Sequence, residues 1–168
     1  MPSSLESEFK DCLVSETQGL AVGNPIDYTT FVGPVIHSAS YDKLRDVIDA
    51  ASKDSELELC CGGIYDDSRG YFLYPTVYRR SNPNHELLSR ELCGPILVVY
   101  VYDDKKHDDP QGAFAEACKL VDETLQYGLT CAIFASDRNV VRFAEDRLVN
   151  TAGNFYINCK STGAVVGQ

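Results

Sequence analysis

Apolar residues recur at three- and four-residue intervals in several segments of the chain, and this period predicts amphipathic helices. The first predicted helix covers residues 5–18 and ends at Gly19. In the second, Ser40 is the expected N-cap, and one apolar stripe is formed by Tyr41, Leu44, Val47, Ile48 and Ala51. Further helices are predicted at 84–90, at 113–126 with Gly128 as its end, and at 139–149 with Asp137 as its cap.

The segments between these helices are rich in β-branched and aromatic residues, which predicts strands. They are LELCCGG (57–63), YFLYPTVYR (71–79), GPILVVYVYD (94–103), LTCAIFAS (129–136) and NFYINCK (154–160). Pro75 suggests an edge strand or an extended crossing segment, whereas the continuous apolar run at 94–103 predicts a strand buried on both faces. The polar residues 105–112 predict a solvated loop. The alternation predicts an α/β fold with an open, largely parallel sheet flanked by helices, in one domain over residues 1–168.

Composition limits the classes of function. The chain has 168 residues, of which 44% are hydrophobic, and this is enough for one buried core. A formal net charge of −10 argues against a surface for nucleic acid or for an anionic membrane, because either would need clustered lysine and arginine. No apolar run reaches the roughly 18 residues of a membrane span, and no targeting signal is apparent.

The seven cysteines are scattered through apolar segments, as is typical of reduced intracellular thiols. No C-x-x-C or H-x-x-x-H spacing occurs, so we expect no metal site. Each thiol is more simply a small apolar side chain than a nucleophile. His37, His85 and His107 show no spacing that predicts an acid–base pair.

Glu91-Leu92-Cys93-Gly94-Pro95 stands at the beginning of a predicted strand and is the first candidate site. Glycine and proline fix a tight entry into the strand, and a carboxylate held there can accept hydrogen bonds from two vicinal hydroxyls. On its own, however, such a sequence is more often a turn with a solvated acid.

The second candidate site is the run from Lys160 to Gly163, which follows the last predicted strand. Parallel sheets place ligands at the carboxyl ends of their strands, and successive backbone N–H groups in a glycine-containing loop can bind an anion. A flexible tail is an equally good interpretation of these residues alone.

Six motifs in order resemble the pyrroline-5-carboxylate dehydrogenase branch of the aldehyde dehydrogenase superfamily. They are VGNP, FVGPVI, DDSRGYFLYPTV, ELCGPILVVYVY, YGLTCAIFAS and AGNFYINCKSTGAVVGQ. The resemblance covers residues from about 5 to 168, and the last motif is the most specific. It implies NAD-dependent oxidation of glutamate semialdehyde to glutamate in proline catabolism, in which a cysteine thiolate attacks the aldehyde and water hydrolyses the thioester.

The resemblance also implies residue roles. Glu91 would bind the hydroxyls of the nicotinamide ribose, and the backbone N–H groups of Gly163 and Ala164 would bind the α-carboxylate of the substrate. Lys160, Ser161 and Thr162 would shape this loop. The parent enzyme would be a homo-oligomer that binds NAD and a small aldehyde, in the mitochondrial matrix if the source is eukaryotic.

The chain also departs from the family pattern. Cys93 stands where the family usually has a phenylalanine against the nicotinamide, and none of the seven cysteines lies in a nucleophile motif. We therefore expect the nucleophile and the dinucleotide-binding domain to lie upstream, and the strand that joins subunits to lie downstream. The 168 residues alone are expected to be inactive, and the alternative is a non-catalytic interaction or antigen module derived from the same enzyme.

Overall fold

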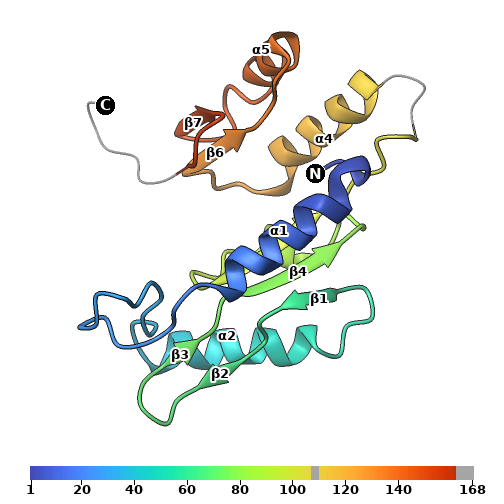
Figure 1. The fold of residues 1–168 in the computed structure, drawn as a ribbon. Coiled ribbons are helices and arrows are strands. Elements are labelled where there is room, and N and C mark those ends of the chain that lie inside the picture. Colours follow the sequence, from blue (N-terminus) through green and yellow to red (C-terminus); the bar gives the residue numbers. More distant parts are fainter. Residues whose placement is uncertain (107–109, 162–168) are drawn as a thin grey trace. The chain divides into compact units, whose positions relative to one another are not determined.

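The computed structural model describes residues 1–106 and 110–161. The chain divides into two compact units, Met1–Tyr102 and Asp103–Gln168, and each is described by itself (Figure 1). This division does not test the expectation of one domain over residues 1–168, which stays a prediction. None of the helices in the described ranges is both long enough and apolar enough to cross a membrane.

The first unit contains helices and short strands in mixed order. Its elements are η1 (Ser3–Leu5), α1 (Glu6–Gln18), α2 (Ser38–Ala51), β1 (Glu58–Cys61), β2 (Tyr65–Asp66), β3 (Phe72–Leu73), β4 (Thr76–Arg80), α3 (Glu86–Ser89) and β5 (Ile96–Tyr100). Strands β1, β4 and β5 form one sheet in that order, in which β4 runs parallel to β5 and antiparallel to β1. Strands β2 and β3 form a separate antiparallel pair.

Successive side chains of β4 point alternately toward two different helices. Val77 and Arg79 lie toward α1, where they line a small cavity together with Phe9 and Leu13. Tyr78, on the opposite face, packs in a buried cluster with Val47 of α2. Because successive side chains on a strand point to opposite faces, this sheet is covered by α1 on one side and by α2 on the other.

The second unit has the element order α4 (Pro110–Thr124), β6 (Thr130–Ile133), α5 (Arg138–Arg147) and β7 (Asn154–Ile157). Strands β6 and β7 are parallel. Cys118 of α4 and Ala144 of α5 are buried, and Cys131 and Phe155 of the strands pack against them. The unit is thus a strand–helix–strand crossover with an additional helix, as parallel pairing requires. The predicted α/β fold is confirmed, with its described strands distributed over three open sheets.

The apolar stripe predicted for α2 is confirmed, because all five of its residues are buried. The predicted cap of this helix is wrong. The helix begins at Ser38, and the ring Nδ1 of His37 accepts the N–H of Ser40 at 3.0 Å. Ser40 therefore lies inside the first turn.

Three further details of the predicted elements are wrong. Strand β4 begins directly after Pro75 and is the central strand of its sheet, so the proline marks a strand start. Strand β5 is only partly buried, with Leu97 48% exposed. Helix α4 begins at Pro110, so the loop predicted at 105–112 ends sooner, and its residues 107–109 lie outside the described ranges.

Gly128 does not end α4, which stops at Thr124. A Cβ at Gly128 would lie 1.9 Å from the carbonyl oxygen of Thr151, which no side chain tolerates. The carbonyl of Gly128 accepts the N–H of Gly153 at 3.0 Å. The glycine therefore permits the close approach of two backbone segments just before β6 and β7 begin.

Candidate functional site

Glu91 lies in the turn between α3 and β5, and its side chain is exposed. Within the part of the chain that the structure describes, its carboxylate has neither an ion pair nor a hydrogen bond. An ionised carboxylate only accepts hydrogen bonds and has about four lone-pair positions, so it can receive two neighbouring hydroxyls at once. The side chain therefore fits the ribose-binding role that the resemblance implies.

The turn after Glu91 has an unusual backbone. Cys93 has φ 55°, a left-handed conformation that costs free energy for a residue with a side chain. The N–H of Ile96 donates to the carbonyl of Gly94 at 2.8 Å, and the N–H of Thr76 donates to the carbonyl of Pro95 at 2.9 Å. The turn thus ends in hydrogen bonds that join it to the start of the β4–β5 pair.

Helix α2 contacts the same turn through two adjacent residues. The ammonium of Lys43 donates to the carbonyl oxygens of Glu91 at 3.1 Å and of Leu92 at 3.3 Å. A Cβ at Gly94 would lie 2.5 Å from Cδ1 of Leu44, so a larger residue there would force this fully buried side chain to shift. Sequence reasoning missed the contribution of Lys43, because the two segments are far apart in the sequence.

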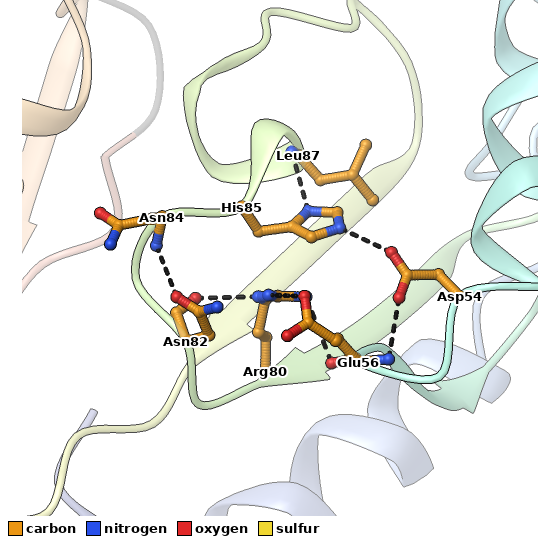
Figure 2. A network of polar contacts seen from close by, with 7 residues as sticks. All are labelled: Asp54, Glu56, Arg80, Asn82, Asn84, His85 and Leu87. Atoms are coloured by element: carbon orange, nitrogen blue, oxygen red, sulfur yellow. Dashed lines mark hydrogen bonds and ion pairs between the residues drawn. The ribbon is translucent and has the colours of Figure 1, made fainter.

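A network of polar contacts supports α3, the helix that precedes Glu91 (Figure 2). His85 is the N-cap of α3, and its Nδ1 accepts the N–H of Leu87 at 3.0 Å. Its Nε2 lies 2.9 Å from Oδ2 of Asp54. A nitrogen that accepts an N–H carries no proton, so Nε2 is the protonated nitrogen and donates to Asp54. Both ring nitrogens of His85 therefore have partners, and the histidine has a structural role.

Arg80 occupies the centre of the same network, at the end of β4 (Figure 2). It is only 1% exposed. Its Nε donates to the carbonyl of Asn82 at 2.8 Å, and its two terminal nitrogens donate to the carbonyl of Glu56 at 3.3 Å and to Oε2 of Glu56 at 2.5 Å. The guanidinium therefore joins the segment before β1 to the segment before α3.

Hydrogen bonds in this network change the acidity of two carboxyl groups. The hydrogen bond from His85 is the largest cause that lowers the pKa of Asp54, and the N–H of Glu56 adds to it. The hydrogen bond and the charge of Arg80 lower the pKa of Glu56. Both groups are therefore held in their ionised form.

The second candidate site follows β7. Asn158 has φ 52°, and its side-chain amide exchanges two 2.9 Å hydrogen bonds with the backbone of Ala135. Its own N–H donates to the carbonyl of Ile133 at 2.8 Å. Asn158 therefore fixes the place where the chain leaves β7, and Lys160 and Ser161 beyond it are exposed. Thr162, Gly163 and Ala164 lie outside the described residues.

The cysteines do not form a site of their own. Cys61 and Cys118 are buried, and burial raises the pKa of the Cys60, Cys118 and Cys131 thiols, which makes them poor nucleophiles. Among the residues that the structure describes, no group of three or more histidine, cysteine, aspartate or glutamate side chains is arranged to hold a metal ion.

Comparison with known proteins identifies the family. The model described as "Aldehyde dehydrogenase family" matches residues 1–168. The chain belongs to the aldehyde dehydrogenase family. Two curated family members are a mitochondrial delta-1-pyrroline-5-carboxylate dehydrogenase of Emericella nidulans, 55% identical over 166 residues, and its human counterpart, 40% identical over 169 residues. Alignment with them includes 99% and 100% of this chain but only 28% and 29% of their own lengths.

Solved aldehyde dehydrogenases have the same fold. The Mycobacterium tuberculosis Delta-pyrroline-5-carboxylate dehydrogenase bound with NAD is 35% identical and has a TM-score of 0.85. The similarity covers 99% of this chain and 29% of that one. The resemblance to the pyrroline-5-carboxylate dehydrogenase branch is thereby confirmed. The chain spans less than a third of these relatives, so the activity of a whole family member comes to it as a proposal.

Proposed function

We propose that this chain is part of an NAD-dependent dehydrogenase that oxidises glutamate semialdehyde, the open form of pyrroline-5-carboxylate, to glutamate. The observation that supports this most strongly is the 55% identity to the Emericella nidulans enzyme over 166 residues. Two motifs of this chain carry the proposed site residues. One is the turn at Glu91, just before β5, and the other is AGNFYINCKSTGAVVGQ, whose last residues follow the parallel strand β7, and α/β proteins bind ligands at the carboxyl ends of such strands.

In this proposal, Glu91 binds the two hydroxyls of the nicotinamide ribose. The cofactor supplies the hydride acceptor, and the role of Glu91 is to hold the ring in one orientation. The carboxylate is exposed and has no ion pair or hydrogen bond among the described residues, which fits that role, as does the constrained turn that carries it. A fixed ring orientation raises the reaction rate, because the orientational entropy of the ring is already lost on binding.

The backbone N–H groups of Gly163 and Ala164 are proposed to bind the α-carboxylate of the substrate. The described residues that lead to this segment, Cys159, Lys160 and Ser161, are exposed beyond the carboxyl end of the parallel strand β7, where α/β proteins bind ligands. The hydrogen bonds of Asn158 with Ala135 fix the place where the chain leaves β7. The proposal also includes a homo-oligomer with no nucleic-acid or membrane partner, which lies in the mitochondrial matrix if the source is eukaryotic.

Replacing Glu91 by alanine in a full-length enzyme that carries this chain should lower the turnover number several-fold, up to about tenfold, because the nicotinamide loses its orienting contact. Folding should be unaffected, since the side chain is exposed. Steady-state kinetics with glutamate semialdehyde and NAD measure the effect.

Glu86→Ala is the matched control, because it removes another exposed carboxylate from the helix just before the turn. It should leave turnover close to that of the parent enzyme. An unchanged turnover number in Glu91→Ala, or equal losses in both variants, would remove Glu91 from the cofactor site.

The 168 residues by themselves should form no NADH from glutamate semialdehyde. None of the seven cysteines lies in a nucleophile motif, and the raised pKa values of the Cys60, Cys118 and Cys131 thiols make these three poor nucleophiles. NAD should bind them with a dissociation constant above about 10 μM, because Glu91 contacts only one sugar. Spectrophotometry at 340 nm and calorimetry test these expectations. NADH formation that is lost when one of the seven cysteines is replaced would contradict the first of them.

An interaction module derived from the same enzyme is the second candidate function. The loop between α1 and α2 favours it, because Ile26, Tyr28, Phe31 and Ile36 are between 76% and 102% exposed. Backbone hydrogen bonds hold this loop, for example from the N–H of Phe31 to the carbonyl of Ala21 at 2.9 Å. The two candidates differ in whether the chain occurs within a longer polypeptide, so the sequence of the parent transcript upstream of Met1 separates them.

A further inference from the structure

Lys43 of α2 contacts the turn that carries Glu91. We propose that Lys43 is a positioning residue for Glu91, which it holds through the backbone of the turn. The inference rests on the proposed function of Glu91 as a ribose-binding residue. It assigns to Lys43 no direct contact with the cofactor.

The contact joins helix α2, which is fixed by its packing, to the irregular turn that carries Glu91. Helix α2 is fixed by its buried face, where Tyr41 is 3% exposed and Leu44 is 0% exposed. The ring of Tyr41 also packs edge-on against Tyr65, with the ring centroids 6.1 Å apart. The backbone of Lys43 therefore has a fixed position from which its side chain can act on the turn.

Lys43 holds two successive carbonyl groups rather than one. Its ammonium carries three donors and reaches the oxygens of Glu91 and Leu92 at 3.1 and 3.3 Å. Two bonded peptide planes in sequence restrict the rotation of the backbone between them, and the Cα of Glu91 adjoins the first of these planes. The direction in which the Glu91 side chain leaves the turn is then restricted as well.

The neighbouring residue of α2 holds the other end of the turn. Leu44 lies so close to Gly94 that a Cβ there would be 2.5 Å from its Cδ1. Between the two contacts, Cys93 adopts its left-handed conformation with φ 55°. A strained residue persists only where the surroundings determine the backbone, and Lys43 and Leu44 supply that constraint from one helix.

The first test uses the 168-residue chain itself. Carbonyl ¹³C chemical shifts of Glu91 and Leu92 should change in Lys43→Met, which removes the ammonium, and should return most of the way in Lys43→Arg, which retains a charged donor. Lys53→Met is the matched control, because Lys53 is an exposed lysine just beyond the end of the same helix. Unchanged carbonyl shifts in a folded Lys43→Met chain would overturn the proposal.

The second test uses a full-length enzyme that carries the chain and measures the dissociation constant of NAD by calorimetry. Lys43→Met should weaken NAD binding on the order of three- to tenfold, a modest effect because the contact is exposed to solvent. If Lys43 acts through Glu91, the double variant with Glu91→Ala should bind NAD no more weakly than Glu91→Ala alone.

The outcomes of this cycle separate the two claims. Additive losses would mean that Lys43 acts independently of Glu91, and the positioning role would fail while the proposed function survives. An NAD affinity unchanged by Glu91→Ala would instead overturn the proposed role of Glu91 itself.

Discussion

Replacing Arg80 by methionine should lower the free energy of unfolding of the Met1–Tyr102 unit by about 3 kcal/mol. The guanidinium is 1% exposed and donates to the carbonyls of Asn82 and Glu56. Methionine is of similar length but has no donor, so these acceptors would lose their partner inside the protein. Urea denaturation followed by circular dichroism measures the loss.

Arg79 provides a matched control on the same strand. Its side chain points to the opposite face, is 30% exposed and pairs with Glu6 of α1 at 2.5 Å. Water still screens this partly exposed ion pair, so Arg79→Met should cost clearly less than Arg80→Met, about 1 kcal/mol. Equal losses in the two variants would show that the buried network around Arg80 has no special role in stability.

Replacing Ala164 by proline in a full-length enzyme should lower catalytic efficiency toward glutamate semialdehyde by about ten- to a hundredfold. Proline has no backbone N–H, and a hydrogen bond to a charged group contributes about 1.5–3 kcal/mol. Ala164→Ser keeps the N–H and should stay close to the parent enzyme. The ratio kcat/KM for each variant measures the effect.

Propanal, an aldehyde without a carboxylate, controls for distortion of the loop by proline. Its oxidation should lose far less efficiency in Ala164→Pro than the oxidation of glutamate semialdehyde does. Equal losses with both aldehydes in a folded enzyme would mean that the loop supports the structure and does not bind the carboxylate.

The regular elements of this fold could be predicted because each has a local signal. The period of the α2 stripe predicted the five residues that the structure buries, and Asp137 caps α5 by accepting the N–H of Asn139 at 2.7 Å. Both signals depend only on residues a few positions apart. Tertiary packing then reinforces them.

The errors come from interactions that local patterns do not specify. Ser40 has the usual chemistry of an N-cap, but His37 supplies an acceptor earlier in the chain, and the helix begins there. Gly128 resembled a helix end, whereas its structural role depends on Thr151, a residue distant in the sequence. Sequence alone cannot reveal which of several suitable residues meets its partner.

The residues of the candidate site also differ in whether the sequence alone indicates them. Glu91 was proposed from a motif, and the structure places it in the turn before β5, while its role stays a prediction. The contact of Lys43 with this turn carries no local signal, because it spans 48 residues and joins an ammonium to backbone atoms. Such contacts depend on how α2 packs against the sheet.

Hydrogen bonds at both ends of the β6–β7 pair fix the register of the two strands. Parallel strands have no tight turn between them to set their alignment, and a slip of one residue would exchange the two faces of a strand. Gly153 bonds to Gly128 at one end, and Asn158 bonds to Ala135 at the other. A slipped β7 would lose both anchors and also displace Cys159, Lys160 and Ser161, so the alignment of this strand pair also sets where the chain leaves the sheet.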